Sequence, residues 1–143
     1  MDLPPTLLGI TTFVLHRVAV TSRSAVAERM ARDAGLGLWQ FAVLAAVADT
    51  GPAAQREIGD SLGLDPSDLA RLMDELLTAD LVARERDTAD RRRYRVTLTT
   101  TGRAALRRAK AVVAKVEQET LAPLTETERK RLHALVGKIH RAR

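Results

Sequence analysis

The chain has 143 residues, no cysteine and a net charge of +5. Its length predicts a single domain with helical extensions, and the absence of cysteine excludes a disulfide scaffold, a thiolate metal site and a thiol redox switch. No apolar run approaches the roughly 20 residues that span a bilayer. No basic segment precedes an apolar stretch at the N-terminus, so we expect a cytoplasmic protein without membrane partners.

The charge is unevenly distributed along the chain. Residues 1–83 carry six basic and eleven acidic groups, whereas residues 84–95 carry six basic and three acidic groups. Residues 129–143 carry six basic groups and no acidic group. The positive field is therefore expected on segment 84–95 and at the C-terminal end, unless these groups only solvate the surface.

The first third of the chain reads as two helices. Apolar residues recur at spacings of three and four from residue 6 to about residue 32, and Gly35 can end that helix. A second, short helix fits residues 38–49, and the Thr-Gly-Pro run that follows interrupts it.

The next segment predicts a helix-turn-helix. A third helix fits residues 54–62, and Gly63 ends it. The fourth helix has clear start signals, because Asp65 is a good N-cap and Pro66 suits the first helical position. Two helices joined by so short a turn form the helix-turn-helix motif.

A β-hairpin with an arginine-rich tip follows directly. Tyr94, Val96 and Leu98 alternate with polar residues, which is the period of a half-buried strand. The preceding run from residue 81 alternates in the same way. Consecutive arginines in the loop between the strands are suited to contact DNA phosphates and the minor groove.

Two helices complete the chain. Thr99 is expected to cap a fifth helix that runs to about Thr120, and Pro123 interrupts the chain. Thr125 with Glu128 forms a capping box for the last helix. The predicted fold is therefore mainly α, a winged helix-turn-helix with a two-stranded β-wing, plus N- and C-terminal helices.

This order of elements resembles the MarR family of transcriptional regulators. The most specific mark of the family is Asp-x-Arg-x5-Leu-Thr-x2-Gly, and it is matched at Asp90, Arg92, Leu98, Thr99 and Gly102. The resemblance covers residues from about 6 to 141 and implies a two-fold dimer with one domain per chain, residues 1–143. The implied parts of that domain are dimerisation helices at 6–34 and 100–143 and a DNA-binding region at 36–99, with the wing at about 81–98.

In that family the fourth helix enters the major groove of DNA and the wing reaches the adjacent minor groove. Carried over residue by residue, the resemblance implies a role for Asp90 in orienting a neighbouring arginine and phosphate contacts from the wing stem. The implied DNA-binding residues are Ser67, Asp68 and Arg71 on the helix, Arg84 and Arg86 on the stem, and Asp90, Arg91, Arg92 and Arg93 in the loop.

The chain departs from the family pattern at two acidic residues. Asp68 stands where a hydroxyl residue is usual; it either serves the helix N-terminus or accepts a hydrogen bond from a cytosine amino group. Asp80 stands where glycine is common and is expected to adopt a positive φ. With acidic residues on the fourth helix, affinity is expected to rest on the wing and to depend strongly on salt.

Many relatives release DNA when a small aromatic or anionic molecule enters a cleft between the dimer helices and the winged helix. His16, Arg17 and Trp39 are the candidates for such an effector site here. The alternatives are a dimer-interface position for His16 and a packing role for Trp39. No cofactor or metal is predicted, because no histidine has an acid or cysteine at metal-ligand spacing.

The sequence therefore predicts a dimeric repressor that binds a pseudo-palindromic operator in double-stranded DNA and is released by a small effector. The alternative is a protein-interaction module on the same fold with weak DNA binding, which the acidic first 83 residues favour. An enzyme is not predicted, because phosphate loops, nucleophile elbows and paired catalytic carboxylates are missing.

Overall fold

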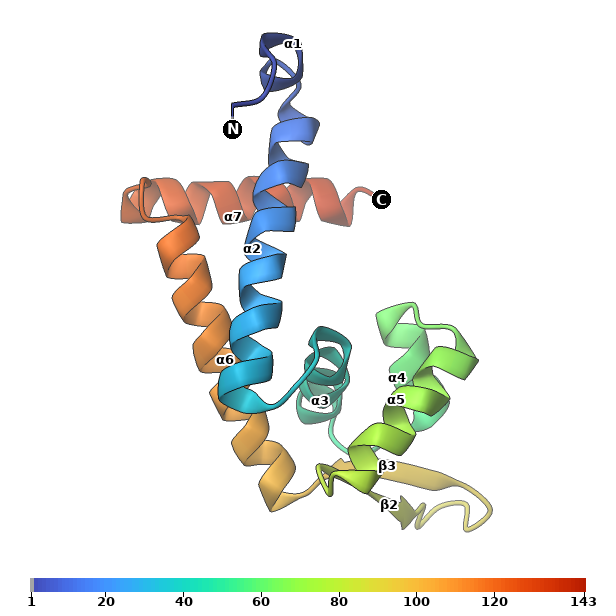
Figure 1. The fold of residues 1–143 in the computed structure, drawn as a ribbon. Coiled ribbons are helices and arrows are strands. Elements are labelled where there is room, and N and C mark those ends of the chain that lie inside the picture. Colours follow the sequence, from blue (N-terminus) through green and yellow to red (C-terminus); the bar gives the residue numbers. More distant parts are fainter. Residues whose placement is uncertain (1) are drawn as a thin grey trace. The chain divides into compact units, whose positions relative to one another are not determined.

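The computed structural model describes residues 2–143 and is mainly helical (Figure 1). Contacts divide it into two compact units: the first runs to Ala25 and resumes at Ala114, and the second comprises Val26–Val113. The elements in chain order are α1 (Pro5–Leu8), α2 (Thr11–Ala34), α3 (Leu38–Thr50), β1 (Ala53–Ala54), α4 (Gln55–Leu62), α5 (Pro66–Thr78), β2 (Val82–Arg86), β3 (Tyr94–Leu98), α6 (Thr100–Thr120) and α7 (Glu126–Arg141).

The second unit is the winged helix-turn-helix. Helix α3 contacts α4, α5 and β3, and α5 contacts β2, so that the helices surround a core of aliphatic side chains. Met30, Val43, Met73 and Leu76 are among the fully buried members of this core. Since the chain has so few aromatic residues, leucine, valine and methionine supply most of the apolar area that stabilises the unit.

The predicted helix-turn-helix is confirmed, with Gly63 at the end of α4 and Asp65 as the N-cap of α5. Gly63 follows α4 with φ of 64°, the left-handed conformation that glycine adopts without a steric penalty. The Asp65 carboxylate accepts a hydrogen bond from the Ser67 amide at 2.8 Å, and Pro66 occupies the first turn of α5. The backbone freedom of Gly63 therefore ends α4, and the side chain of Asp65 starts α5.

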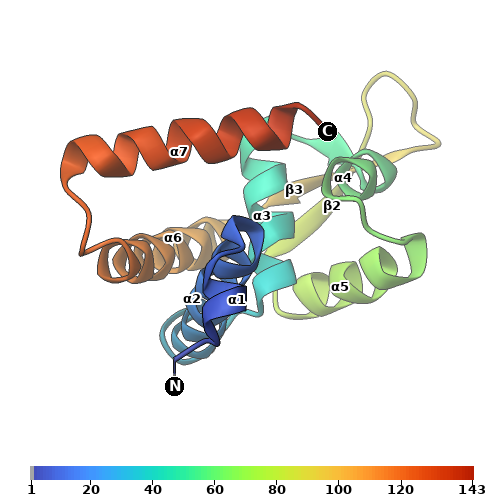
Figure 2. The ribbon, with the colours of Figure 1, turned by 90° about the horizontal axis from the view of Figure 1, so that it is seen from above.

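The wing belongs to a three-stranded antiparallel sheet of order β1-β3-β2, so the predicted two-stranded wing was incomplete. Ala53 pairs with Val96 and Ala54 with Arg95, and the predicted third helix accordingly starts at Gln55. In two perpendicular views the loop between β2 and β3 projects beyond the helices of its unit (Figure 1, Figure 2).

The junction between the wing and α6 explains the spacing of the Leu-Thr-x2-Gly motif. The Thr99 hydroxyl donates to the Asp80 carbonyl at 2.6 Å and accepts from the Gly102 amide at 2.9 Å, which caps α6 as predicted. The Thr99 amide donates to the Leu81 carbonyl at 3.2 Å. A Cβ at Gly102 would overlap that carbonyl oxygen, so only glycine fits.

In the first unit, the predicted N-terminal helix is divided into two helices, whereas the predicted capping box of the last helix is confirmed. The single helix expected from residue 6 is divided at Gly9, which ends α1, and glycine is unfavourable in a helix interior. The Thr125–Glu128 capping box is present: the Glu128 amide donates to the Thr125 hydroxyl at 3.2 Å, and the Thr125 amide donates to the Glu128 carboxylate at 2.9 Å.

Large apolar side chains remain exposed on the first unit. Val116 is buried, but the exposed fractions of eight others lie between 38% and 59%. These residues are Leu8, Ile10, Leu15, Val18, Val20, Leu135, Val136 and Ile139. None of the described helices is both long enough and apolar enough to cross a membrane.

Candidate nucleic-acid interface

The N-terminus of α5 is ordered by its cap. Besides accepting from the Ser67 amide, the Asp65 carboxylate accepts a hydrogen bond from the Ser67 hydroxyl, and together these bonds hold the pKa of Asp65 below its ordinary value. The Ser67 hydroxyl, predicted to face a base, is therefore engaged within the protein. It can still accept a hydrogen bond through its second lone pair.

Arg71, the single basic residue of α5, lies between two acids of the same helix. Its Nη1 is 3.1 Å from Glu75 Oε1, and its Nη2 is 3.9 Å from Asp68 Oδ1. The Arg71 side chain is 61% exposed, so these exposed ion pairs orient the guanidinium more than they stabilise the fold. Asp68 thus faces Arg71, one turn away on the same helix face.

The Arg71 guanidinium is also linked to α3 through two further hydrogen bonds. Gln40 Nε2 donates to Glu75 Oε2 at 2.8 Å, and the Gly37 amide donates to Gln40 Oε1 at 3.0 Å. The start of α3 is thereby connected to the basic group of α5 by the relay Gly37–Gln40–Glu75–Arg71. The role of Gln40 could not be predicted from the sequence, because its partner is 35 positions away and leaves no local pattern.

Asp90 closes the wing loop. Its carboxylate accepts from the backbone amide of Arg92 at 3.1 Å and from Arg92 Nε at 3.2 Å, and it lies 3.7 Å from Arg93 Nε. The hydrogen bonds from the side chain and the amide of Arg92 lower the pKa of Asp90, and the charge of Arg93 adds to them. Asp90 therefore orients two of the three loop arginines, which agrees with its predicted role.

Arg86 fixes the other side of the loop. Its Nη1 donates to the Arg91 carbonyl at 2.6 Å, and its guanidinium lies over the Tyr94 ring at 5.1 Å, within the range of cation–π attraction. Tyr94 was predicted to lie on the apolar face of a half-buried strand, but it is 48% exposed. Its position at the outer end of β3 places it against Arg86 in the strand register instead of the core.

Arg91 has a different environment from its neighbours. Within the described part of the chain, its guanidinium has no hydrogen bond or ion pair, while its backbone carbonyl is held by Arg86. Arg91 is exposed and lies in the projecting loop between β2 and β3. The loop thus presents one unneutralised guanidinium on a backbone fixed from both sides.

A hydrogen bond joins the stem of the wing to the helix-turn-helix. Arg84 Nη2 donates to Gln55 Oε1 at 3.0 Å, and Gln55 is the first residue of α4. The bond links the wing to the first helix of the motif. Arg84 keeps free donors for a phosphate, so its predicted DNA contact stays a prediction.

The three predicted effector residues lie in different units. His16 and Arg17 are exposed on the part of α2 that belongs to the first unit, where the His16 ring is 6.4 Å from that of Phe13. Trp39 belongs to the second unit, on α3, and is 45% exposed. Their joint effector site stays a prediction. Among the described residues, no group of three histidines and carboxylates is arranged to hold a metal ion.

Comparison with known proteins gives concordant matches. The model of the MarR family matches residues 34–93. The HTH-type transcriptional repressor NicR from Pseudomonas putida is 33% identical over 92 residues, which are 64% of this chain and 58% of NicR.

Two solved structures share the fold. A mutant MarR from E. coli complexed with operator DNA is 25% identical with a TM-score of 0.77, covering 97% of this chain and 99% of that one. The PcaV transcriptional regulator from Streptomyces coelicolor, in complex with its natural ligand, is 26% identical with a TM-score of 0.75, covering 99% of both chains.

Proposed function

We propose that this chain, which belongs to the MarR family of DNA-binding transcriptional regulators, is a homodimeric repressor that a small molecule releases from a pseudo-palindromic operator. In this proposal α5 enters the major groove and the wing enters the adjacent minor groove. Two copies related by a two-fold axis would occupy half-sites roughly one helical turn apart and so exclude other proteins from the promoter.

The observation that carries the proposal is the wing loop. Asp90 and Arg86 hold its backbone, while the Arg91 guanidinium has no partner in the described chain. A narrow minor groove has an enhanced negative potential that attracts an inserted arginine. We assign this insertion to Arg91 and assign orientation of the loop to Asp90, Arg92 and Arg93.

The homodimer is supported by the exposed apolar side chains of the first unit. Eight large apolar side chains are exposed on this unit, and large exposed apolar patches are rare on monomers and mark interaction sites. A second copy is the occupant that fits best, because α7 contributes Leu135, Val136 and Ile139 at helical spacing beside a polar face. The dimerisation helices at 6–34 and 100–143 are therefore part of the proposal.

Repression and release are supported by the names of the relatives. NicR is a repressor, and PcaV was solved with its natural ligand. Residues 1–83 are acidic, as is α5, yet the match to a structure with operator DNA favours DNA binding over the protein-interaction module. The acidic α5 instead predicts that affinity depends mainly on the wing.

A binding selection from random duplex DNA, followed by titration of the selected sequence at two salt concentrations, tests the proposal. We expect an inverted repeat bound by a dimer, with affinity that falls steeply as salt rises. Arg91→Ala should weaken binding more than roughly tenfold and reduce the salt slope by about one. Arg108→Ala, which removes an exposed arginine from α6, is the matched control and should change affinity less than about twofold.

Two results would contradict the proposal. A folded, dimeric protein that enriches no sequence would speak against an operator. A folded Arg91→Ala variant with unchanged affinity would remove the wing from the interface even if an operator were found.

A further inference from the structure

Three charged residues lie together on one face of α5. Asp68, Arg71 and Glu75 are spaced by three and four positions, which makes them neighbours on a helix surface. All three side chains are exposed, and with two acids and one base the cluster has a negative net charge. DNA phosphates repel such a cluster, so Arg71 is poorly suited to act as a general phosphate contact.

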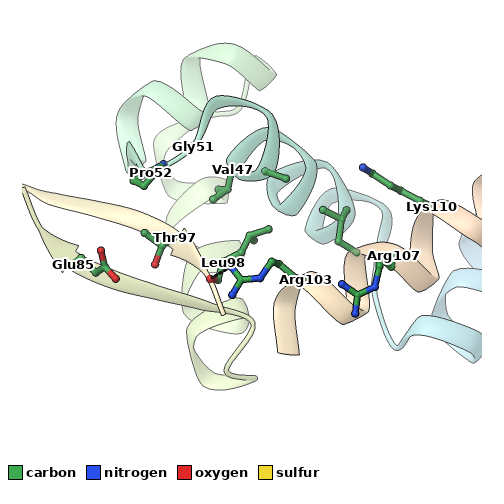
Figure 3. Close-up of a pocket in the computed structure, with 11 residues that line it drawn as sticks. Val47, Gly51, Pro52, Glu85, Thr97, Leu98, Arg103, Arg107 and Lys110 are labelled. Carbon is green, nitrogen blue, oxygen red and sulfur yellow. Dashed lines mark hydrogen bonds between the residues drawn. The ribbon is translucent and has the colours of Figure 1, made fainter. Parts of the chain in front are cut away.

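The cations of α6 have a different environment. Arg103, Arg107 and Lys110 follow one another along that helix at spacings of four and three (Figure 3), which places them on one face. Among the described residues, no carboxylate pairs with any of these three cations. Arg107 is exposed like Arg71, and it therefore serves as a reference for an arginine without acidic neighbours.

Arg71 keeps free donors while Glu75 holds it. A guanidinium has five N–H donors in a planar fork, and the hydrogen bond of Arg71 within the described chain runs from Nη1 to Glu75 Oε1 at 3.1 Å. Asp68 Oδ1 lies 3.9 Å from Nη2, which is too far for a hydrogen bond. Guanine presents two acceptors, O6 and N7, in the major groove, and the arginine fork matches them with two parallel bonds. Arg71 can therefore bind a guanine without leaving Glu75.

Gln40 holds the carboxylate that holds Arg71. Its Nε2 donates to Glu75 Oε2 at 2.8 Å, so one oxygen of Glu75 is bound to α3 and the other to Arg71. The Gly37 amide donates to Gln40 Oε1 at 3.0 Å, which fixes the amide plane of Gln40. A carboxylate bound at one oxygen can rotate, whereas bonds at both oxygens restrict its orientation and that of the arginine fork.

We propose that Gln40 is a positioning residue for the reading of DNA sequence: through Glu75 it directs the Arg71 fork toward a guanine in the major groove. The inference rests on the function proposed above, in which α5 enters that groove. The two acids keep Arg71 away from phosphates, so α5 supplies base discrimination and the wing supplies most of the affinity.

Titration of the full-length dimer with modified forms of the selected operator tests the role of Arg71. At one guanine position at a time, 7-deazaguanine replaces guanine in both half-sites; this base lacks the N7 acceptor and still pairs with cytosine. We expect one position at which the change lowers wild-type affinity at least about tenfold. In Arg71→Ala the same change should matter less than about twofold, because the fork that uses N7 is gone. Arg107→Ala is the matched control and should keep the wild-type difference.

Two substitutions of Gln40 separate its two hydrogen bonds. Gln40→Glu keeps an acceptor for the Gly37 amide but has no N–H donor for Glu75, whereas Gln40→Met loses both bonds. Both should reduce the difference at that guanine to less than about threefold. Gln55→Glu is the matched control, because it introduces the same charge at the start of α4 and should leave the difference unchanged.

The inference is wrong if no guanine of the operator shows this dependence, if the dependence persists in Arg71→Ala, or if a folded Gln40→Glu keeps it. Loss of the dependence in Gln40→Met alone would assign the effect to the cap of α3 and exclude the bond to Glu75 as its source. An operator is bound in each of these cases, so the proposed function would stand. Failure to enrich any sequence would contradict the proposed function and this inference together.

Discussion

Replacing Gly102 by alanine tests the close contact at the junction between the wing and α6. The added Cβ would overlap the Leu81 carbonyl oxygen and lie 2.8 Å from its carbon, whereas nonbonded carbons prefer about 3.5–4.0 Å. Both partners are backbone, so no side-chain rotation relieves the overlap. The start of α6 must move away from Leu81.

The cost follows from what that movement breaks. Overpacking of this kind costs about 1–3 kcal/mol. The hydrogen bonds from Thr99 to the Leu81 and Asp80 carbonyls contribute about 1 kcal/mol each, and the higher helix propensity of alanine returns about 1 kcal/mol. We therefore expect Gly102→Ala to lower the free energy of unfolding by about 2–4 kcal/mol.

Urea unfolding followed by far-ultraviolet circular dichroism, at fixed protein concentration, measures this change through the midpoint at constant slope. Gly9→Ala is the control, because a Cβ there meets backbone oxygens only at 3.5 and 3.7 Å, and its effect should stay within about 0.5 kcal/mol. A loss below about 1 kcal/mol for Gly102→Ala would refute the argument.

Three further predictions concern association, pH and the recognition helix. Ile139→Glu should weaken dimerisation at least tenfold, because it removes an apolar group that contributes roughly 1.5–3 kcal/mol when buried. Sedimentation velocity measures this, and a variant that stays dimeric at wild-type concentrations contradicts the interface. Hydrogen bonds in the folded state lower the pKa of Asp65 and of Glu128. The unfolded state therefore binds more protons than the folded state near pH 4. As a result, the free energy of unfolding should fall as pH drops below about 4. The Asp65→Asn, Glu128→Gln double variant should show a shallower decline in urea midpoint, and an identical decline would exclude these two caps as its source. Glu75→Gln should raise affinity for random DNA roughly two- to tenfold, because it frees Arg71 and removes a negative charge near the phosphates; a filter-binding titration in which affinity is unchanged would remove this acid from the interface.

Much of the fold could be predicted from the sequence because the signals that start and end its helices are local. The caps at Asp65, Thr99 and Thr125 each act within three residues of themselves, and each was identified from residue type and spacing. The positive φ expected at Asp80 is confirmed at 57°. The left-handed turn at Gly63 follows the same logic, since only the chemistry of the residue itself is needed.

The features that could not be predicted depend on partners distant in sequence. Strand β1 has two residues, too few for a periodic signal, and it exists because Ala53 meets Val96 across the sheet. The bond between Gln40 and Glu75 likewise requires α3 to pack beside α5. In the wing, the sequence indicated a group of arginines. It could not indicate that the Arg91 side chain lacks the carboxylate partner of its neighbours, because that difference arises from the loop conformation.

The connection between the wing and α6 has a mechanical consequence. Strand β3 ends at Leu98 and α6 begins at Thr100, so a single hydrogen-bonded residue joins them. Because the connection is this short, we expect a tilt of the helix to be passed on to the strand. Helix α6 has 21 residues and is therefore roughly 30 Å long. A rotation of about 5° about one end displaces the other end by about 3 Å, which is comparable to the length of a hydrogen bond. In the proposed complex, such a small angular change would be enough to move Arg91 out of the minor groove.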